Sequence, residues 1–382
     1  MTAATEGDVR ELSIVRLVAG GDGLAFIDGK AVFVPGVLPG ERVSIRLTRH
    51  RRDYDRGTLL EVLDPSPHRV APGCRYAGVC GGCDWLHIRY EEQLRQKASI
   101  TAEALKRTGG IEREEPGVEP SEPWRARNRA QLHLAGDGGL GYMGAGSARV
   151  VAVEACPIVA SAVEKLFRGE AHYPRGLERF TVFGTTETLA VEGRDDDREL
   201  AVTVNRRRIV FSVGCFFQSN LLVLEKLVSW ALAGLEGRTA ADLYCGVGLF
   251  GSFLSDRFSR IICVESSAMS LSFARRNVPG TSHEFYPMSV EQWTSTAAGR
   301  EALDAALVDP PRAGLGPQVR RWLVEKGPPK LVYVSCNPVT LARDLAGLLA
   351  GGYTLDDLRL FDFYPQTSHI EAAAKLSRGG TQ

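Results

Sequence analysis

The first sixty or so residues alternate between apolar and polar positions in short runs that glycines interrupt. Alternation with period two is typical of strands that bury one face. Asp28 and Gly29 separate two of these runs, and Asp-Gly between alternating segments is a strong hairpin signal. The predicted strands are LSIVRLV, GLAFI, KAVFV, ERVSIRL and GTLLEVL. Together they predict a small closed β-barrel of the OB type over residues 1–66.

The middle of the chain, residues 67–214, has a mixed pattern. Residues 90–106 predict an amphipathic helix, which we expect to reach about residue 110 and to pack on the C-terminal domain. Residues 124–134 predict a strand. Its two faces would carry Arg125, Arg127 and Arg129 on one side and Ala126, Asn128 and Ala130 on the other. A row of guanidinium groups suits a phosphate backbone, although an ordinary polar sheet face is the more common explanation. Later apolar runs near residues 150, 180 and 200 indicate an antiparallel sheet.

At about residue 215 the pattern changes to alternating strands and helices. LLVLEKLVSWALAGL predicts a buried helix, and TAADLYCGVGLFGSFLS predicts a strand, a glycine loop and a helix. Further strands are predicted for RIICVE, HEFYPMS, DAALVDPPR, KLVYVSC and LDDLRLFDFYP. This order predicts an α/β fold with a doubly wound, Rossmann-like sheet over residues 215–382. Ligands of such sheets bind at the carboxyl ends of the strands.

Composition narrows the class of protein only moderately. The chain has 382 residues, of which 44% are hydrophobic, and this fits two or three domains with their own cores. Its 46 basic and 46 acidic side chains cancel, so binding to a polyanion would need local patches. No apolar signal segment and no run of about eighteen apolar residues occurs, so we expect neither export nor a membrane span. We expect a cytoplasmic monomer whose cysteines serve as ligands, catalysts or core residues and not as disulfides.

A basic stretch, RLTRHRRDYDRG, lies between the last two predicted strands of the barrel. It contains Arg46, Arg49, Arg51, Arg52 and Arg56 together with His50 and Tyr54. An exposed basic loop with an aromatic ring suits phosphate and base contacts, and charge alone fits a solvated hairpin tip equally well. The segment GGDGLAFIDGKAVFVPGVLPGERV resembles a TRAM domain, a small RNA-binding barrel attached to several RNA-modifying enzymes. This resemblance implies that the first domain binds RNA.

Four cysteines form a candidate metal centre in the middle domain. Cys74, Cys80 and Cys83 are separated by five and two residues, and glycines among them allow the backbone to wrap an inorganic centre. Cys156, which precedes a proline, is the candidate fourth ligand. Four thiolates suit an iron-sulfur cluster or a structural zinc ion, and the single Cys-x-x-Cys pair favours the cluster. Free buried cysteines are the disfavoured alternative, because a glycine-rich triplet is not a typical core segment.

Several polar side chains and glycines follow the predicted strands of the C-terminal domain. Gly246, Gly248 and Gly251 fit the pattern G-x-G-x-x-G, which by itself suits NAD, FAD or S-adenosylmethionine. Glu265 ends the second strand, where an acid can bind ribose hydroxyls, and Asp309 ends a later one. Because the carboxyl ends of parallel strands meet at one edge, we expect these residues to line one cleft.

Cys336 lies between an apolar strand and a helix that begins with Asn337 and Pro338. The partial positive charge of a helix start lowers a cysteine pKa, so the position predicts a reactive thiol and disfavours a core-filling one. A pyrimidine C5 methyltransferase needs a thiolate that adds to C6 and a base that then removes the C5 proton. Glu371 is the candidate base. An NAD enzyme has no specific need for this thiol, although aldehyde dehydrogenases use one.

The motifs FFQSN, DLYCGVGLFG, DPPRAG, VSCNPVTLARD and HIE resemble those of the uracil-5 RNA methyltransferase family, and the resemblance covers all 382 residues. It implies S-adenosylmethionine-dependent methylation of uridine, with 23S rRNA as the expected substrate and tRNA as an alternative. Cys336 would be the nucleophile and Glu371 the proton acceptor. The residues implied to line the cofactor and uracil pocket are Gln218, Tyr244, Gly246, Gly248, Glu265, Ser289 and Asp309. Members with the cysteine triplet carry a 4Fe-4S cluster, which implies that its ligands in a central iron-sulfur β-sheet domain are Cys74, Cys80, Cys83 and Cys156.

Two positions depart from the family pattern. Leu249 stands where many relatives have asparagine, and Ser289 stands where they have Asp or Asn at the end of the third strand. We therefore expect weaker or different adenosine contacts. Two other activities remain open: an RNA cytosine-5 methyltransferase, whose cysteine is typically beside a proline, and a non-catalytic RNA-binding iron-sulfur protein. Among the other residues, we expect His369 to position Glu371 and Phe216 to stack on a base.

Overall fold

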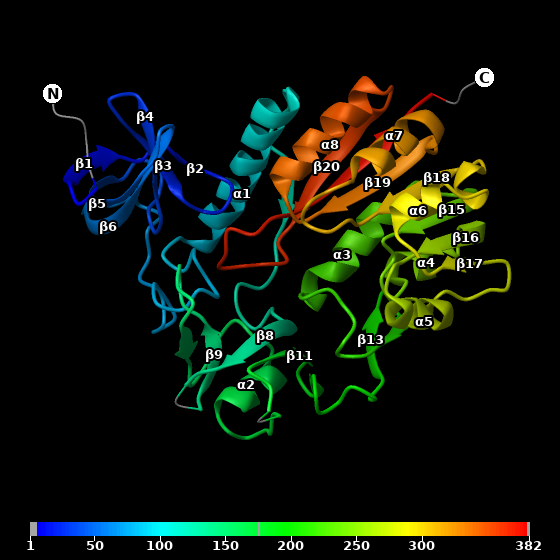
Figure 1. Ribbon diagram of the computed structural model, residues 1–382, viewed down its shortest axis with the longest axis horizontal. Coiled ribbons are helices and arrows are strands. Elements are labelled where there is room, and N and C mark those ends of the chain that lie inside the picture. The colour runs from blue at the N-terminus through cyan, green and yellow to red at the C-terminus, as the bar shows by residue number, and fades with distance from the viewer. Residues whose placement is uncertain (1–5, 137, 175, 380–382) are drawn as a thin grey trace.

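The computed structural model describes residues 6–136, 138–174 and 176–379. Three parts follow one another along the chain (Figure 1): an all-β part, a middle part with its own sheet, and a large α/β part. No helix in the described ranges is long and apolar enough to cross a bilayer.

The N-terminal part is a six-stranded sheet in the order β1-β5-β6-β4-β3-β2. Its strands are β1 (Val9–Ser13), β2 (Arg16–Leu17), β3 (Gly23–Ile27), β4 (Lys30–Val34), β5 (Arg42–His50) and β6 (Tyr54–Asp64). Its core is formed by apolar residues at alternating strand positions, such as Val32, Val34, Val43 and Ile45, which are fully buried. The predicted Asp-Gly hairpin is confirmed, since Ile27 pairs with Lys30 and both turn residues have positive φ, 49° and 81°.

Two details of this part differ from the prediction. The run LSIVRLV divides into β1 and β2, because Ile14 turns into the core and its N–H bonds to the carbonyl of Glu41 at 2.9 Å. The basic stretch is mostly strand and not loop: β5 continues to His50 and β6 begins at Tyr54. Its arginine side chains remain exposed, on the two strands and, for Arg51 and Arg52, in the turn between them.

The middle part begins with irregular, cysteine-bearing chain and continues into helix α1 (Tyr90–Ala104), which a π-turn, Leu105–Gly109, extends. This helical segment packs against helix α8 (Pro338–Ala350) of the C-terminal part. A five-stranded antiparallel sheet follows, with helix α2 (Ser161–Phe167) on it. Its strands in pairing order are β10 (Val150–Ala152), β9 (Leu140–Met143), β8 (Arg129–Leu134), β11 (Arg179–Gly184) and β12 (Leu189–Val191).

The predicted row of arginines does not form, because β8 begins only at Arg129. Arg125 has a positive φ of 58° and forms an ion pair with Glu164. Arg127 turns inward and is enclosed beside the cysteines. The guanidinium groups of Arg125 and Arg127 therefore have different environments. The alternative prediction, that the arginines form an ordinary polar sheet face, is also wrong. Ala126, Asn128 and Ala130 are all buried, but only Ala130 belongs to the strand, so the predicted opposite face does not form as one strand face either.

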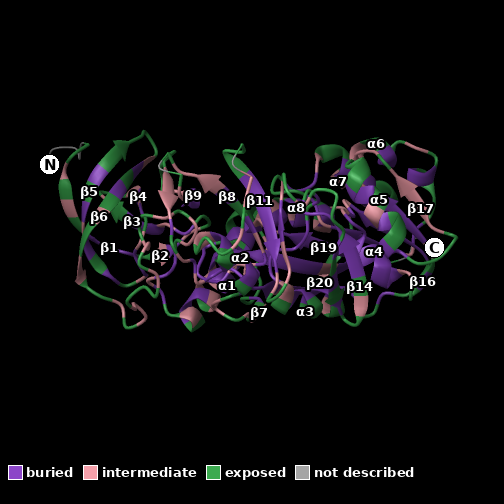
Figure 2. Cartoon of the chain, turned by 90° about the horizontal axis from the view of Figure 1, so that it is seen from below, coloured by how far each residue is buried: buried purple, intermediate pink, exposed green. Residues whose placement is uncertain are grey.

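The C-terminal part contains an eight-stranded mixed sheet. In pairing order its strands are β17 (Glu284–Tyr286), β16 (Phe258–Val264), β15 (Gly237–Leu243), β18 (Ala305–Val308), β19 (Lys330–Ser335), β21 (Glu371–Ser377), β20 (Thr354–Phe361) and β7 (Gly117–Glu119). Helices cover both faces, so the doubly wound prediction is confirmed, and Figure 2 shows the sheet as buried. One face packs on α3 (Leu221–Leu232), α4 (Leu249–Leu254) and α5 (Ala268–Asn277). The other face packs on α1, α6 (Val290–Thr294), α7 (Pro317–Lys326) and α8.

Two strands of this sheet were not predicted. β21 is antiparallel and inserts between β19 and β20, while β7 comes from the middle of the chain and pairs with β20. The hairpin of β13 (Leu200–Val204) and β14 (Arg207–Phe211) shares a hydrophobic core with α3. The core of the α/β part therefore extends across the expected boundary at residue 215.

Candidate active site

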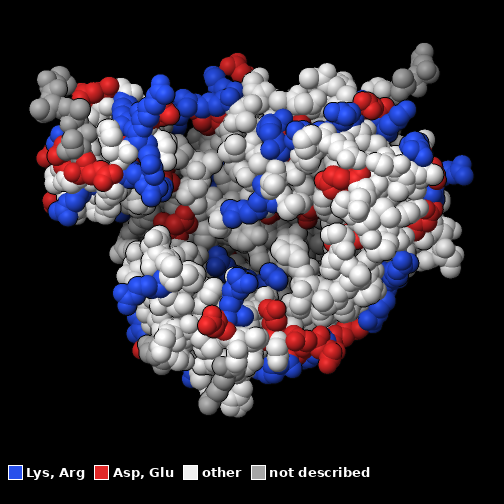
Figure 3. Space-filling model, in the orientation of Figure 1, with Lys and Arg blue, Asp and Glu red and all other residues white. Residues whose placement is uncertain are grey.

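A cleft of about 840 Å³ opens at the carboxyl edge of the parallel strands. It is lined by the predicted residues Gln218, Tyr244, Gly246, Glu265, Ser289, Asp309, Cys336 and Glu371. They come from seven separate stretches of sequence, which the strand order brings together at the positions expected for ligands. In Figure 3, Lys and Arg side chains gather around the hollow where the three parts of the molecule meet.

The local position of Cys336 is confirmed. β19 ends at Ser335, and α8 begins with Pro338 after its N-cap Asn337. The Asn337 side chain accepts a hydrogen bond from the N–H of Val339 at 3.0 Å and donates one to the carbonyl of Arg312 at 3.1 Å. These bonds fix the turn and leave the half-buried thiol facing the cleft.

The expected low pKa of this thiol is wrong. Burial raises the pKa of Cys336 to about 11, the nearby carboxyl groups of Glu371 and Asp309 raise it further, and Arg312 offsets only part of the effect. Burial also raises the pKa of Asp309 to about 7, and burial together with Asp309 holds the pKa of Glu371 well above its usual range. Three acidic groups in one buried site disfavour negative charge more than the helix start favours it. The cleft is therefore electrostatically suited to a cation.

Asp309 and Gln218 form one wall of the cleft near Cys336 and Glu371. Asp309 follows β18, and the Gln218 amide nitrogen lies 3.4 Å from its Oδ2. Gln218 precedes Asn220, whose side chain caps α3 by accepting the N–H of Leu222 at 3.0 Å. The end of β18 thus positions the Asp309 carboxyl group, and the start of α3 positions the Gln218 amide.

The glycine loop forms the other end of the cleft. Tyr244 has a positive φ of 62°, and its hydroxyl donates to Glu291 at 3.5 Å. Glu265 accepts hydrogen bonds from the N–H of Gly246 at 3.1 Å and of Ser267 at 2.7 Å. Its carboxylate is therefore oriented at the end of β16, where an acid can bind ribose hydroxyls.

Three expectations about this end need correction or refinement. Gly248 does not line the cleft: its φ is +78°, and a Cβ there would lie 2.9 Å from Cα of Ala274, so the glycine allows α4 to pack closely on α5. Leu249 is buried in the hydrophobic core and does not line the cleft, so the expected effect of this position on adenosine contacts stays a prediction. Ser289 lines the cleft and also caps α6, since its hydroxyl accepts the N–H of Gln292 at 3.2 Å.

Sequence reasoning missed several residues of the cleft. These are Arg312, Tyr364 and Met288. Phe216, which was expected to stack on a base, also lines the cleft. Arg312 lies in the DPPRAG motif, so that motif could have identified it, whereas no pattern marks Met288 or Tyr364. The guanidinium of Arg312 lies 3.4 Å from Nδ1 of His369.

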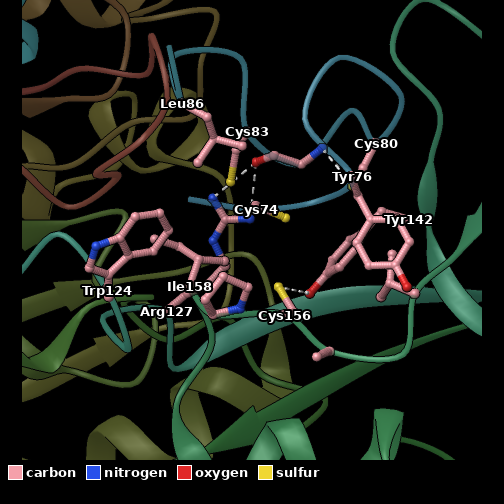
Figure 4. Close-up of a pocket in the computed structure, with 14 residues that line it drawn as sticks. Cys74, Tyr76, Cys80, Cys83, Leu86, Trp124, Arg127, Tyr142, Cys156 and Ile158 are labelled. Atoms are coloured by element: carbon pink, nitrogen blue, oxygen red, sulfur yellow. Dashed lines mark hydrogen bonds between the residues drawn. The ribbon is translucent and has the colours of Figure 1, made fainter. Parts of the chain in front are cut away.

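The four predicted cysteines line a second, smaller cavity of about 30 Å³ in the middle part (Figure 4). Arg127 is buried between them, and its guanidinium approaches the carbonyl of Gly82 at 3.5 Å. The hydroxyl of Tyr142 donates to Sγ of Cys156 at 3.7 Å. Within the described ranges no three metal-ligating side chains lie close enough together to hold an ion. The four cysteines supply suitable donor atoms and share an apolar cavity with a buried cation, but their described side chains do not converge on a metal site in this arrangement.

The pKa of Cys336 predicts how the free thiol reacts. Because the pKa is about 11, we expect alkylation of Cys336 by iodoacetamide to accelerate about tenfold per pH unit between about pH 8 and 10. We also expect S-adenosylmethionine, whose sulfonium carries a positive charge, to accelerate alkylation at pH 8 relative to S-adenosylhomocysteine, which lacks the sulfonium. Mass spectrometry of the Cys336 peptide measures both rates, with the buried Cys263 as internal control. A plateau below about pH 8 would contradict the raised pKa.

Comparison with known proteins identifies the family. A model described as tRNA (uracil-5-)-methyltransferase matches residues 185–379, and a TRAM domain model matches residues 3–60. An uncharacterized RNA methyltransferase of Treponema denticola is 33% identical over 376 residues, which cover 90% of this chain and 93% of that protein. The 23S rRNA (uracil(1939)-C(5))-methyltransferase of Edwardsiella ictaluri is 32% identical over 410 residues, covering 94% and 93%.

A solved structure supports the same relationship. Pyrococcus abyssi tRNA (uracil-54, C5)-methyltransferase, solved with S-adenosyl-L-homocysteine, matches with a TM-score of 0.72 and 25% identity, covering 96% of this chain and 100% of that one. The resemblance seen in the sequence motifs is thereby confirmed. Because a family model spans half of the chain and relatives align over nearly all of it, this protein belongs to the RNA (uracil-5-)-methyltransferase family, as an S-adenosylmethionine-dependent enzyme with an N-terminal TRAM domain.

Proposed function

We propose that the enzyme methylates C5 of one uridine in 23S rRNA through a covalent adduct between Cys336 and C6 of the base. The supporting observation is the register of two strands. Ser335, the last residue of β19, pairs with Ala372 of the antiparallel β21, so Cys336, which follows β19, and Glu371, which begins β21, come to the same edge of the sheet, where Glu371 acts on the charge of the thiol. Both line the same cleft. A nucleophile and a base in this relation can reach C6 and C5 of one pyrimidine ring.

The chemistry follows from this arrangement. The thiolate of Cys336 adds to C6, and the electron pair moves to C5, which becomes the nucleophile for the methyl group. Glu371 then removes the C5 proton, and the electrons of that bond expel the thiolate from C6. S-adenosylmethionine supplies the methyl group and, when bound, a positive charge that suits a cleft resistant to anions. Asp309 and Gln218 form a polar wall suited to holding the uracil edge.

The polar wall must bind a base that has left its stack, since C5 and C6 are not accessible to such a pocket within a helix. Phe216 is 57% exposed at the cleft and offers a ring for stacking. The TRAM part adds exposed arginines on β5 and β6 for backbone phosphates. The chain has no net charge, so RNA binding must depend on local patches such as these arginines.

The proposal of 23S rRNA as substrate rests on the named relatives from Edwardsiella ictaluri and two other bacteria, which are 30–32% identical. A tRNA is the alternative, given the Pyrococcus abyssi structure. An RNA cytosine-5 methyltransferase is less well supported, because asparagine and not proline follows Cys336. We take the enzyme to act in the cytoplasm as a monomer.

Mapping 5-methyluridine in 23S rRNA and tRNA from a deletion strain tests this proposal. We expect one site in 23S rRNA to lose its methyl group and to regain it when the gene is restored. Loss of the mark from tRNA alone would shift the substrate to tRNA. Loss of 5-methylcytidine would refute uridine as the target.

We further propose that Cys74, Cys80, Cys83 and Cys156 hold a 4Fe-4S cluster. Such a cluster would cross-link the cysteine loop to the middle sheet and thereby fix the loop structurally. Anaerobically purified protein should be brown and contain about four iron atoms per chain. The Cys156→Ala variant should lose most of the iron, whereas Cys263→Ala, in the core of the α/β part, should retain it. Colourless protein with stoichiometric zinc would refute the cluster.

A further inference from the structure

The loop that leads to Glu371 is buried although it has no regular structure. Residues 362–370 connect β20 to β21, and within them Gln366, Thr367 and Ser368 are only 5%, 2% and 8% exposed. Buried backbone groups require hydrogen-bond partners, so the residues that supply them determine where this loop lies. His369 and Glu371, at its end, both face the cleft.

The partners come from the segment that directly follows Cys83. The carboxylate of Asp84 accepts the N–H of Ser368 at 2.9 Å, and the N–H of Trp85 donates to the carbonyl of Gln366 at 3.0 Å. Gln93 of α1 holds Gln366 from the other side. Its side-chain oxygen accepts the Gln366 N–H at 2.9 Å, and its nitrogen donates to the Gln366 side-chain oxygen at 3.0 Å.

The backbone of Gln366 needs this support. Its φ is +65°, a conformation that is unfavourable for a non-glycine residue and persists only where the surroundings fix it. The hydrogen bonds of Trp85 and Gln93 to Gln366, and of Asp84 to Ser368, provide that constraint. The loop conformation at Gln366 and Ser368 therefore depends on hydrogen bonds to Asp84, Trp85 and Gln93, in addition to bonds within the loop such as the one from the Thr367 hydroxyl to the carbonyl of Tyr364 at 2.8 Å.

Asp84 lies between the cysteine cavity and a groove that reaches Cys336. Cys83 lines the cysteine cavity, whereas Asp84 lines a groove of about 440 Å³ that also contains Cys336 and His369. The TRAM part closes this contact, since a Cβ at Gly21 would lie 2.6 Å from Oδ2 of Asp84 and 2.7 Å from Cβ of Ser368. One hydrogen bond, from Ser368 to Asp84, thus lies where all three parts meet.

We propose that Asp84 is a positioning residue that holds the loop before Glu371, so that removal of the C5 proton depends on the order of the four-cysteine segment. The inference rests on the proposed role of Glu371 as the base. Cys83 and Asp84 are adjacent, so a change that disorders the cysteine loop also removes the acceptor of the Ser368 N–H. The consequence is selective: addition of Cys336 and methyl transfer precede the step that needs Glu371.

Asp84→Ala tests this inference. We expect methylated RNA to remain covalently bound to the variant in denaturing gels, turnover to fall about tenfold or more, and KM for RNA to change little. Hydrogen exchange of peptides covering residues 364–371 should accelerate. Asp84→Asn keeps a side-chain oxygen for Ser368 and should restore most of the turnover. Glu91→Ala, an exposed acidic position on α1, serves as control, and its turnover should equal that of the wild type.

The outcomes separate this inference from the proposed function. If the wild type methylates uridine and Asp84→Ala neither accumulates adduct nor exchanges faster in the loop, the positioning role is refuted while the mechanism stands. If the wild type forms no adduct-dependent product, the mechanism fails, and the exchange measurement still tests whether Asp84 holds the loop. Iron content equal to wild type in Asp84→Ala shows that the effect arises at the loop; loss of iron from this variant would overturn the assignment.

Discussion

Cys336→Ala is expected to abolish methylation of RNA, with a loss of at least about a thousandfold in turnover. C5 of uracil is a poor nucleophile until a group adds at C6, and among the residues that the structure describes no other cysteine lines the cleft. Transfer of tritium from labelled S-adenosylmethionine to RNA measures the loss. The substitution removes only a half-buried thiol at the end of β19, so we expect the fold to persist.

Two further variants make this result specific. Cys336→Ser keeps the size of the side chain but should be equally inactive, because a hydroxyl ionises even less readily than a thiol of pKa about 11. Cys263→Ala removes a buried sulfur from β16 and should keep normal turnover below its melting temperature. Full activity of Cys336→Ala would refute the covalent mechanism.

Glu371→Gln is expected to trap the methylated RNA as a covalent adduct on Cys336. The amide resembles the protonated carboxyl group that the raised pKa of Glu371 favours, so the pocket should tolerate it. It cannot accept the C5 proton, and without that step the bond between sulfur and C6 cannot break. A gel shift that survives denaturation, with about one S-adenosylhomocysteine released per enzyme, measures the trapped state.

Glu325→Gln is the matched control for this experiment. Glu325 is exposed on α7 and lies outside the cleft, so its variant should turn over normally without adduct. The double variant of Cys336→Ala with Glu371→Gln should form no adduct, which identifies the attachment point. Normal turnover by Glu371→Gln would assign the proton transfer to another group, with Asp309 the next candidate because its pKa is raised to about 7.

Burial and mutual repulsion make both Cys336 and Glu371 difficult to ionise. Cys336, Glu371 and Asp309 share one buried site, and each raises the energy of charging another. The same repulsion that keeps the thiol protonated in the free enzyme favours a bound sulfonium cation. Activation of the nucleophile should therefore accompany cofactor binding, and reaction of the free thiol with other electrophiles should be slow at neutral pH.

The sequence by itself determined the elements whose signals are local. The strand, turn and helix around Cys336 follow from an apolar run followed by Asn and Pro, and the hairpin at Asp28 and Gly29 follows from its turn residues. The glycine loop likewise has its predicted place between β15 and α4. In each case neighbouring residues supply the backbone preferences and hydrogen bonds, so no distant contact is required.

Only the tertiary structure decided which side chains face one another and how they ionise. The register of β21 against β19 brings Glu371 to the edge where Cys336 follows β19. Burial by distant segments raises the thiol pKa that the helix start was expected to lower, and Asp84 binds Ser368, in the loop before Glu371, from 284 positions away in sequence. The predicted row of arginines fails for the same reason, since Arg125 pairs with Glu164 and Arg127 lies in the cysteine cavity. Desolvation and pairing depend on groups that are far apart along the chain, and a local pattern carries no information about them.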